Sequence, residues 1–85
     1  MNSEAEEQVP RETARRLLQA AAVEAFGRPG VYVSRERVMG RAAMVDLELF
    51  LRIAQYLEDE GWIDEADADY GMFTLTVEGL DEAMR

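Results

Sequence analysis

The stretch from residue 47 to residue 60 carries the strongest helical pattern in the chain. Its apolar side chains recur at i, i+3, i+4 and i+7: Phe50, Ile53, Ala54 and Leu57. That spacing places them on one face of an α-helix. Asp46 precedes the run as a favourable N-cap, and Gly61 follows it as a stop. The segment predicts an amphipathic helix, so the rest of the chain has to supply the core that covers its apolar face.

A first helix is predicted over residues 10–26. Pro10 suits the first helical position, where a missing N–H costs nothing. Gly27 is a suitable left-handed cap at the other end, and Pro29 prevents the helix from resuming. The expected apolar stripe is widened by two further side chains and comprises Ala14, Leu17, Leu18, Ala21, Ala22, Ala25 and Phe26.

Between these two helices the sequence predicts a short strand and a second helix. Residues 31–33 form a β-type run of three residues. Ser34 follows as an N-cap for a helix over residues 35–44. The side chains that this helix offers to the core are Val38, Met39 and Ala42.

The chain that follows Gly61 reads as a β-hairpin. Residues 62–63 and residues 72–75 are extended stretches, and they flank a polar loop over residues 64–71. A loop of this length predicts a hairpin wider than the two-residue type.

A last helix is predicted over residues 77–85. Thr76 is its N-cap, and Leu80 and Met84 form an apolar i, i+4 pair. We therefore expect a single domain over residues 10–85, preceded by a flexible acidic N-terminal tail over residues 1–9.

Two short motifs resemble those of bacterial winged helix-turn-helix regulators. Residues 56–63 (Tyr-Leu-Glu-Asp-Glu-Gly-Trp-Ile) are similar to the segment in which the third helix of such proteins runs into the wing. Residues 75–80 (Leu-Thr-Val-Glu-Gly-Leu) resemble the element that closes the wing in MarR-like and PadR-like regulators. The resemblance covers residues 11–85. It implies a mostly helical α+β fold with a three-helix core, a short β-strand plus a β-hairpin wing, and a C-terminal helix.

The residue types argue against an enzyme. Cysteine and histidine are absent, which removes disulfides, thiolate chemistry and the commonest general base and metal ligand. The chain has no phosphate-binding glycine loop and no nucleophile elbow. The acidic loop residues are Asp64, Glu65, Asp67 and Asp69, and they do not follow the EF-hand spacing. We expect no enzymatic activity, no cofactor and no metal site.

No apolar run approaches the roughly 20 residues that a membrane-spanning helix needs. The first eight residues are acidic and lack the apolar centre of a signal peptide. The sequence therefore predicts a cytoplasmic protein with no membrane partner, and nothing in it points to a small-molecule ligand.

Charge is distributed unevenly along the chain, whose net charge is −9. Residues 1–10 carry three acids, and residues 11–45 carry seven arginines against three glutamates. Residues 46–85 carry twelve acids against two arginines, a net charge of −10. Acidity of this kind also arises from genome composition or adaptation to salt, so its placement is more informative than its total.

The predicted outer face of the helix over residues 47–60 is the candidate binding surface. Its polar side chains are Glu48, Arg52, Gln55 and Asp59, and the apolar side chains beside them are Leu49, Leu51 and Tyr56. An apolar surface rimmed by acids is typical of a protein–protein site. We expect the partner to be a protein with a basic surface or a second copy of the chain. Equally, Leu49 and Leu51 are able to pack beneath neighbouring elements.

The alternative is a DNA-binding transcriptional regulator that would dimerise through its first and last helices. In DNA-binding winged helices the third helix enters the major groove, and Lys and Arg neutralise phosphates. The arginines available for such contacts are Arg35, Arg37, Arg41 and Arg52. The acids of the third helix and of the wing disfavour this function, because they repel a phosphate backbone.

Overall fold

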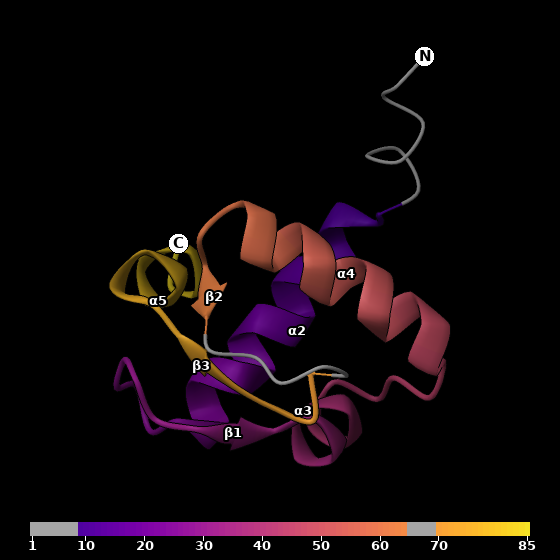
Figure 1. The fold of residues 1–85 in the computed structure, drawn as a ribbon, viewed down its shortest axis with the longest axis horizontal. Coiled ribbons are helices and arrows are strands. Elements are labelled where there is room, and N and C mark those ends of the chain that lie inside the picture. Colours follow the sequence, from indigo (N-terminus) through magenta and orange to yellow (C-terminus); the bar gives the residue numbers. More distant parts are fainter. Residues whose placement is uncertain (1–8, 65–69) are drawn as a thin grey trace.

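The computed structural model describes residues 9–64 and 70–85. This part of the chain is a compact α+β structure of four helices and three short strands. In chain order they are α2 (Arg11–Glu24), β1 (Val33–Ser34), α3 (Arg35–Arg41), α4 (Leu47–Asp59), β2 (Ile63–Asp64), β3 (Met72–Leu75) and α5 (Val77–Ala83). In Figure 1, α5 lies at one end of the molecule, and α4 and α2 cross each other in the view.

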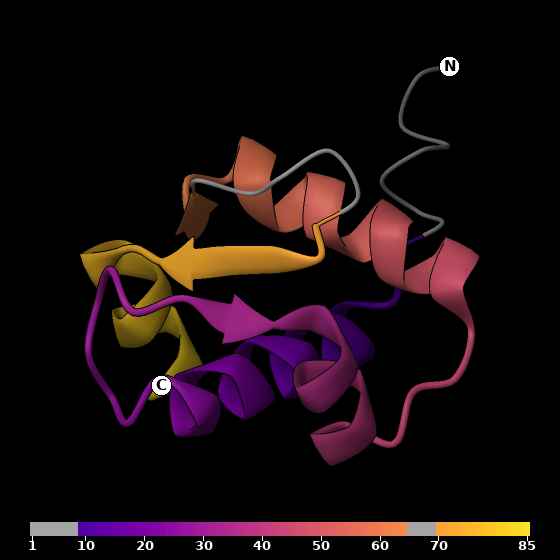
Figure 2. The ribbon, with the colours of Figure 1, turned by 60° about the horizontal axis from the view of Figure 1, so that its bottom comes forward.

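The three strands form one antiparallel sheet in the order β1-β3-β2. β3 is central and pairs Phe73 with Val33 on one side and Leu75 with Ile63 on the other. The predicted hairpin is therefore confirmed in the pairing of β2 with β3. In Figure 2, β3 lies between α4 above it and β1 and α2 below it.

The core forms where α2, α4 and the sheet meet. Phe50 of α4 and Phe73 of β3 are fully enclosed, with ring centroids 6.3 Å apart. The predicted core faces of both long helices are confirmed by the burial of Ala14, Leu17, Leu18, Ala21, Ala25, Phe50, Ile53, Ala54 and Leu57. Val9, assigned from the sequence to the N-terminal tail, is also buried. Residues 1–8, the rest of that expected tail, lie outside the described residues.

The first helix ends earlier than predicted, at Glu24 instead of residue 26. The Phe26 N–H donates to Val23 O (3.0 Å) and the Gly27 N–H donates to Ala22 O (2.9 Å), the two hydrogen bonds of a Schellman motif. Phe26 itself takes the left-handed conformation, with φ of 58°. It leaves the apolar stripe and is 84% exposed, so its predicted place in the core is wrong.

The second helix is also shorter than predicted and ends at Arg41 instead of residue 44. The Met44 N–H donates to Met39 O at 2.8 Å, and Ala43 has φ of 57°. A third cap of this kind ends α4, where Gly61 has φ of 81° and the Trp62 N–H donates to Leu57 O. Only the last of the three helices uses glycine at the left-handed position next to its C-cap.

The predicted N-caps are all confirmed by hydrogen bonds. The side chains of Ser34 and Asp46 accept from the N–H groups of Arg37 (3.4 Å) and Leu49 (3.2 Å). The Thr76 hydroxyl accepts from the Gly79 N–H at 2.9 Å and donates to Gly61 O at 2.7 Å. Thr76 thus starts α5 and ties it to the end of α4.

Helix α5 reaches the core through Gly79 and Ala83. Of the predicted apolar pair, Leu80 is half-buried and packs against the core, whereas Met84 is 77% exposed. None of the helices in residues 9–64 and 70–85 combines the length and apolar character that crossing a membrane requires.

Candidate protein-interaction surface

The polar face of α4 is exposed as predicted. Glu48, Arg52, Gln55 and Asp59 are all exposed, and their spacing of three and four residues puts them on one side of the helix. The Gln55 amide donates to Asp59 Oδ1 at 3.0 Å. Within the described residues Arg52 forms no ion pair with Glu48, so its guanidinium does not neutralise that carboxylate.

The charge of this region is strongly negative. Between residues 46 and 64 Arg52 is the sole base, and the acids are Asp46, Glu48, Glu58, Asp59, Glu60 and Asp64. Asp64 lies in β2, whereas Glu65, Asp67 and Asp69 of the predicted wing loop lie outside the described residues. The acidic region is therefore built by α4, its two ends and β2.

The apolar residues predicted beside this face lie closer to the core than expected of an open binding surface. Leu49, Leu51 and Tyr56 are half-buried and pack against the core. The Tyr56 ring meets the Trp62 ring edge-on, with centroids 6.0 Å apart and planes at 89°. Most of the area of these three side chains is buried against the core, and only their edges reach the surface.

Two apolar side chains that the sequence analysis did not single out are exposed at the start of α4. Val45 is 95% exposed and Leu47 is 45% exposed. Leu47 precedes Phe50 by three residues, a spacing that favours burial, but the first turn of α4 extends past the core. The candidate surface consequently has an apolar end at Val45 and Leu47 and an acidic end at residues 58–60.

Tyr70 forms a contact with α4 that the sequence did not predict. Its hydroxyl donates to Glu58 Oε1 at 2.5 Å and lies 3.2 Å from Gln55 Oε1. Burial and the bond to Glu58 raise the pKa of Tyr70 to about 12. The only local signal was a tyrosine before a glycine at the end of a polar loop. This contact fastens the start of β3 to the outer side of α4.

The arginines proposed for phosphate contacts are divided between two places. Arg37 Nε and Arg41 Nε each lie 2.9 Å from one carboxylate oxygen of Glu24 on α2. The hydrogen bond from Arg37, followed by that from Arg41, lowers the pKa of Glu24. Both guanidinium groups are thus directed at α2, whereas Arg52 lies on the exposed face of α4. Arg35 begins α3, and its backbone N–H donates to Gly71 O at 2.8 Å.

Among the residues that the structure describes, no three His, Cys, Asp or Glu side chains form a group able to hold a metal ion. Comparison of the chain with protein-family models, with curated proteins and with solved structures gave no match in any of the three.

Proposed function

We propose that this chain is a non-enzymatic winged-helix module of the cytoplasm that binds a basic surface of a partner protein through α4. The element order supports the winged-helix interpretation, because a strand between the first two helices and a hairpin after the third are its defining parts. The antiparallel order β1-β3-β2 suits a wing made of β2 and β3. In this interpretation α4 is the third helix and α5 the C-terminal helix.

The observation that carries the proposal is the excess of carboxylates on and around α4. Six acids against one arginine between residues 46 and 64 attract a basic surface and steer its approach. The exposed Val45 and Leu47 add apolar area at one end. A polar rim beside a small apolar patch is the usual anatomy of a protein–protein interface.

DNA binding receives less support from the same geometry. The helix that would enter the major groove presents Glu48 and Asp59 to the phosphates, and these repel. Two of the four arginines available for phosphate contacts, Arg37 and Arg41, are already paired with Glu24. A duplex would have to break both pairs or bind without them.

The test is a capture experiment with matched charge variants. The double variant Glu48→Gln/Asp59→Asn removes two carboxylates from α4. The control Glu78→Gln/Asp81→Asn removes two from the exposed side of α5, so both variants change net charge equally. We expect wild-type and control chains to retain the same protein from host extract with or without nuclease, and the α4 variant to retain at least about tenfold less, roughly 1.4 kcal/mol.

Two outcomes would overturn the proposal. Equal loss in both double variants would mean that overall charge, and not α4, controls binding. A shift of duplex DNA at low salt that weakens steeply as salt is added would establish the regulator alternative instead. Sedimentation of the purified chain separates a second copy from a foreign partner, because self-association appears without any extract.

A further inference from the structure

A hollow of about 160 Å³ lies between α2, α4 and α5. Its apolar lining consists of Ala14, Leu18, Tyr56 and Trp62, and its charged lining consists of Arg11, Arg15 and Glu82. It lies beside the Tyr56 flank of α4, and none of the polar-face residues Glu48, Arg52, Gln55 and Asp59 lines it. The predicted binding surface therefore does not account for it.

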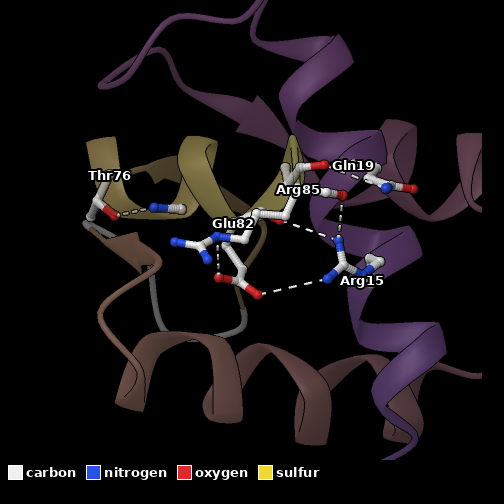
Figure 3. A network of polar contacts seen from close by, with 7 residues as sticks. Arg15, Gln19, Thr76, Glu82 and Arg85 are labelled. Carbon is white, nitrogen blue, oxygen red and sulfur yellow. Dashed lines mark hydrogen bonds and ion pairs between the residues drawn. The ribbon is translucent and has the colours of Figure 1, made fainter.

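The charged rim is held in place by contacts between α2 and α5, which Figure 3 shows from close by. One terminal nitrogen of Arg15 donates to Arg85 O (3.1 Å) and to Glu82 O (3.4 Å), and the other lies 3.8 Å from Glu82 Oε2. Arg85 Nε lies 3.4 Å from the second oxygen of the same carboxylate. Glu82 is thus shared between two guanidinium groups.

Arg11 gives the rim an unmatched cation. The Arg11 side chain forms no hydrogen bond and no ion pair with any residue in the described parts of the chain. Among the side chains that line the hollow, Arg11 and Arg15 face one carboxylate, Glu82, an excess of one positive charge. In a chain whose net charge is −9, this local excess marks the hollow as a place for an anion.

The floor of the hollow suits an apolar group of limited size. Leu18 is fully buried and Ala14 is 3% exposed, so both present carbon atoms and no polar group from below. The edge-on Tyr56 and Trp62 rings form the aromatic wall. An apolar cavity of about 150 Å³ is known to hold one benzene molecule, so this hollow has room for one ring or one branched side chain.

We propose that the hollow binds an apolar carboxylate, in which a single ring or branched side chain lies next to the anionic group. The apolar part packs on Leu18, Tyr56 and Trp62. The carboxylate accepts charge-assisted hydrogen bonds from the guanidinium of Arg11 and from the remaining N–H donors of Arg15. Both a free organic acid and the C-terminal residue of a peptide have this chemistry. The proposal does not depend on the function proposed for α4.

The single tryptophan of the chain, Trp62, reports occupancy by fluorescence. Three probes test whether binding requires the carboxylate and whether it requires a peptide backbone. They are N-acetyl-glycyl-phenylalanine as the free acid, the same peptide as its C-terminal amide, and 3-phenylpropionate. We expect saturable changes in Trp62 emission with the peptide acid, with 3-phenylpropionate or with both. If only the peptide acid binds, the site recognises the C-terminus of a peptide. If 3-phenylpropionate binds, the site accepts free organic acids. The amide should bind about tenfold more weakly than its acid, as expected when one charged hydrogen-bond acceptor is lost.

A pair of arginine variants locates the binding. Arg11→Gln should weaken binding of the acids about tenfold. Arg16→Gln removes the same charge from an exposed position of α2 outside the hollow and should leave binding unchanged. Far-ultraviolet circular dichroism establishes that both variants are folded. The proposal is overturned if neither acid changes the emission saturably, if amide and acid bind equally, or if the two variants behave alike.

Discussion

Gly79 lies directly against the backbone of Trp62, so that a Cβ placed on Gly79 would overlap the Trp62 carbonyl oxygen. The same oxygen accepts a hydrogen bond from the Thr76 N–H at 3.1 Å. The contact joins the first turn of α5 to the residue that follows the end of α4. It also gives a physical reason for a glycine three residues after the capping threonine.

We expect Gly79→Ala to destabilise the domain. Alanine favours a helix over glycine by about 1 kcal/mol, but here its methyl group meets backbone that has little freedom to move. Overpacking of this kind costs about 1–3 kcal/mol; because the clash is with backbone, we expect the upper end of that range and a net loss of up to about 2 kcal/mol in urea unfolding. The matched control is Gly40→Ala in α3, where the added Cβ meets nothing within 4 Å. That variant should be more stable than wild type, and a loss there equal to that of Gly79→Ala would contradict the steric argument.

Ala43→Gly should stabilise the domain. Ala43 has φ of 57° at the end of α3, a conformation that costs an L-residue about 1–2 kcal/mol. Glycine avoids this cost but loses more entropy on folding, so we expect a net gain of about 0.5–1 kcal/mol in urea unfolding. The reverse change, Gly61→Ala at the end of α4, should cost a similar amount because Gly61 has φ of 81°. If the two substitutions change the free energy of unfolding in the same direction, this explanation is wrong.

Tyr70 makes stability depend on alkaline pH. Its pKa is raised from 10.0 to about 12 by burial and by the hydrogen bond to Glu58. The unfolded chain therefore loses this proton first, and the stability that the neutral phenol contributes is present below pH 10 and lost as pH rises towards 12. Tyrosinate absorbance should show one of the three tyrosines titrating late. In Tyr70→Phe that late step should disappear and the alkaline decline of the unfolding free energy should become shallower.

Glu24 makes stability depend on acidic pH in the opposite direction. Its hydrogen bonds with Arg37 and Arg41 lower its pKa below the ordinary glutamate value of 4.5. A carboxyl group with a lowered folded-state pKa stabilises the domain above the unfolded-state value, and this contribution is lost as pH falls. Glu24→Gln should therefore flatten the fall of the melting temperature on acidification. Glu36→Gln, at an exposed position of α3, should leave that slope as in wild type.

The regular parts of the fold were predictable because their signals are local. The apolar period of residues 47–60 and the capping chemistry of Ser34, Asp46 and Thr76 depend only on residues a few positions apart, and they are confirmed. The spacing of apolar residues does not predict at which residue a helix ends. Phe26 continues the predicted stripe in sequence, yet α2 ends before it. Gly27 is left-handed as predicted, but the left-handed conformation already begins at Phe26, one residue earlier, and no signal in the sequence indicates this.

The candidate surface was predictable in its polar half only. Helical spacing is sufficient to place Glu48, Gln55 and Asp59 on one exposed face. The half-burial of Tyr56 depends on the ring of Trp62, and the Tyr70 contact with Glu58 depends on how the hairpin returns to α4. Such contacts follow from how the elements pack, which the spacing of residues along the chain does not encode.

The backbone and the side chain of Trp62 have separate roles. Its N–H ends α4 and its carbonyl receives α5, whereas its indole lines the hollow. The backbone hydrogen bonds at the joint between the two helices therefore do not depend on which side chain stands at this position, although the Trp62 ring also packs against Tyr56. In the proposed site, a replacement such as Trp62→Leu would change the shape of the hollow while these backbone hydrogen bonds are retained, so what the hollow accepts is separable from how the two helices are joined.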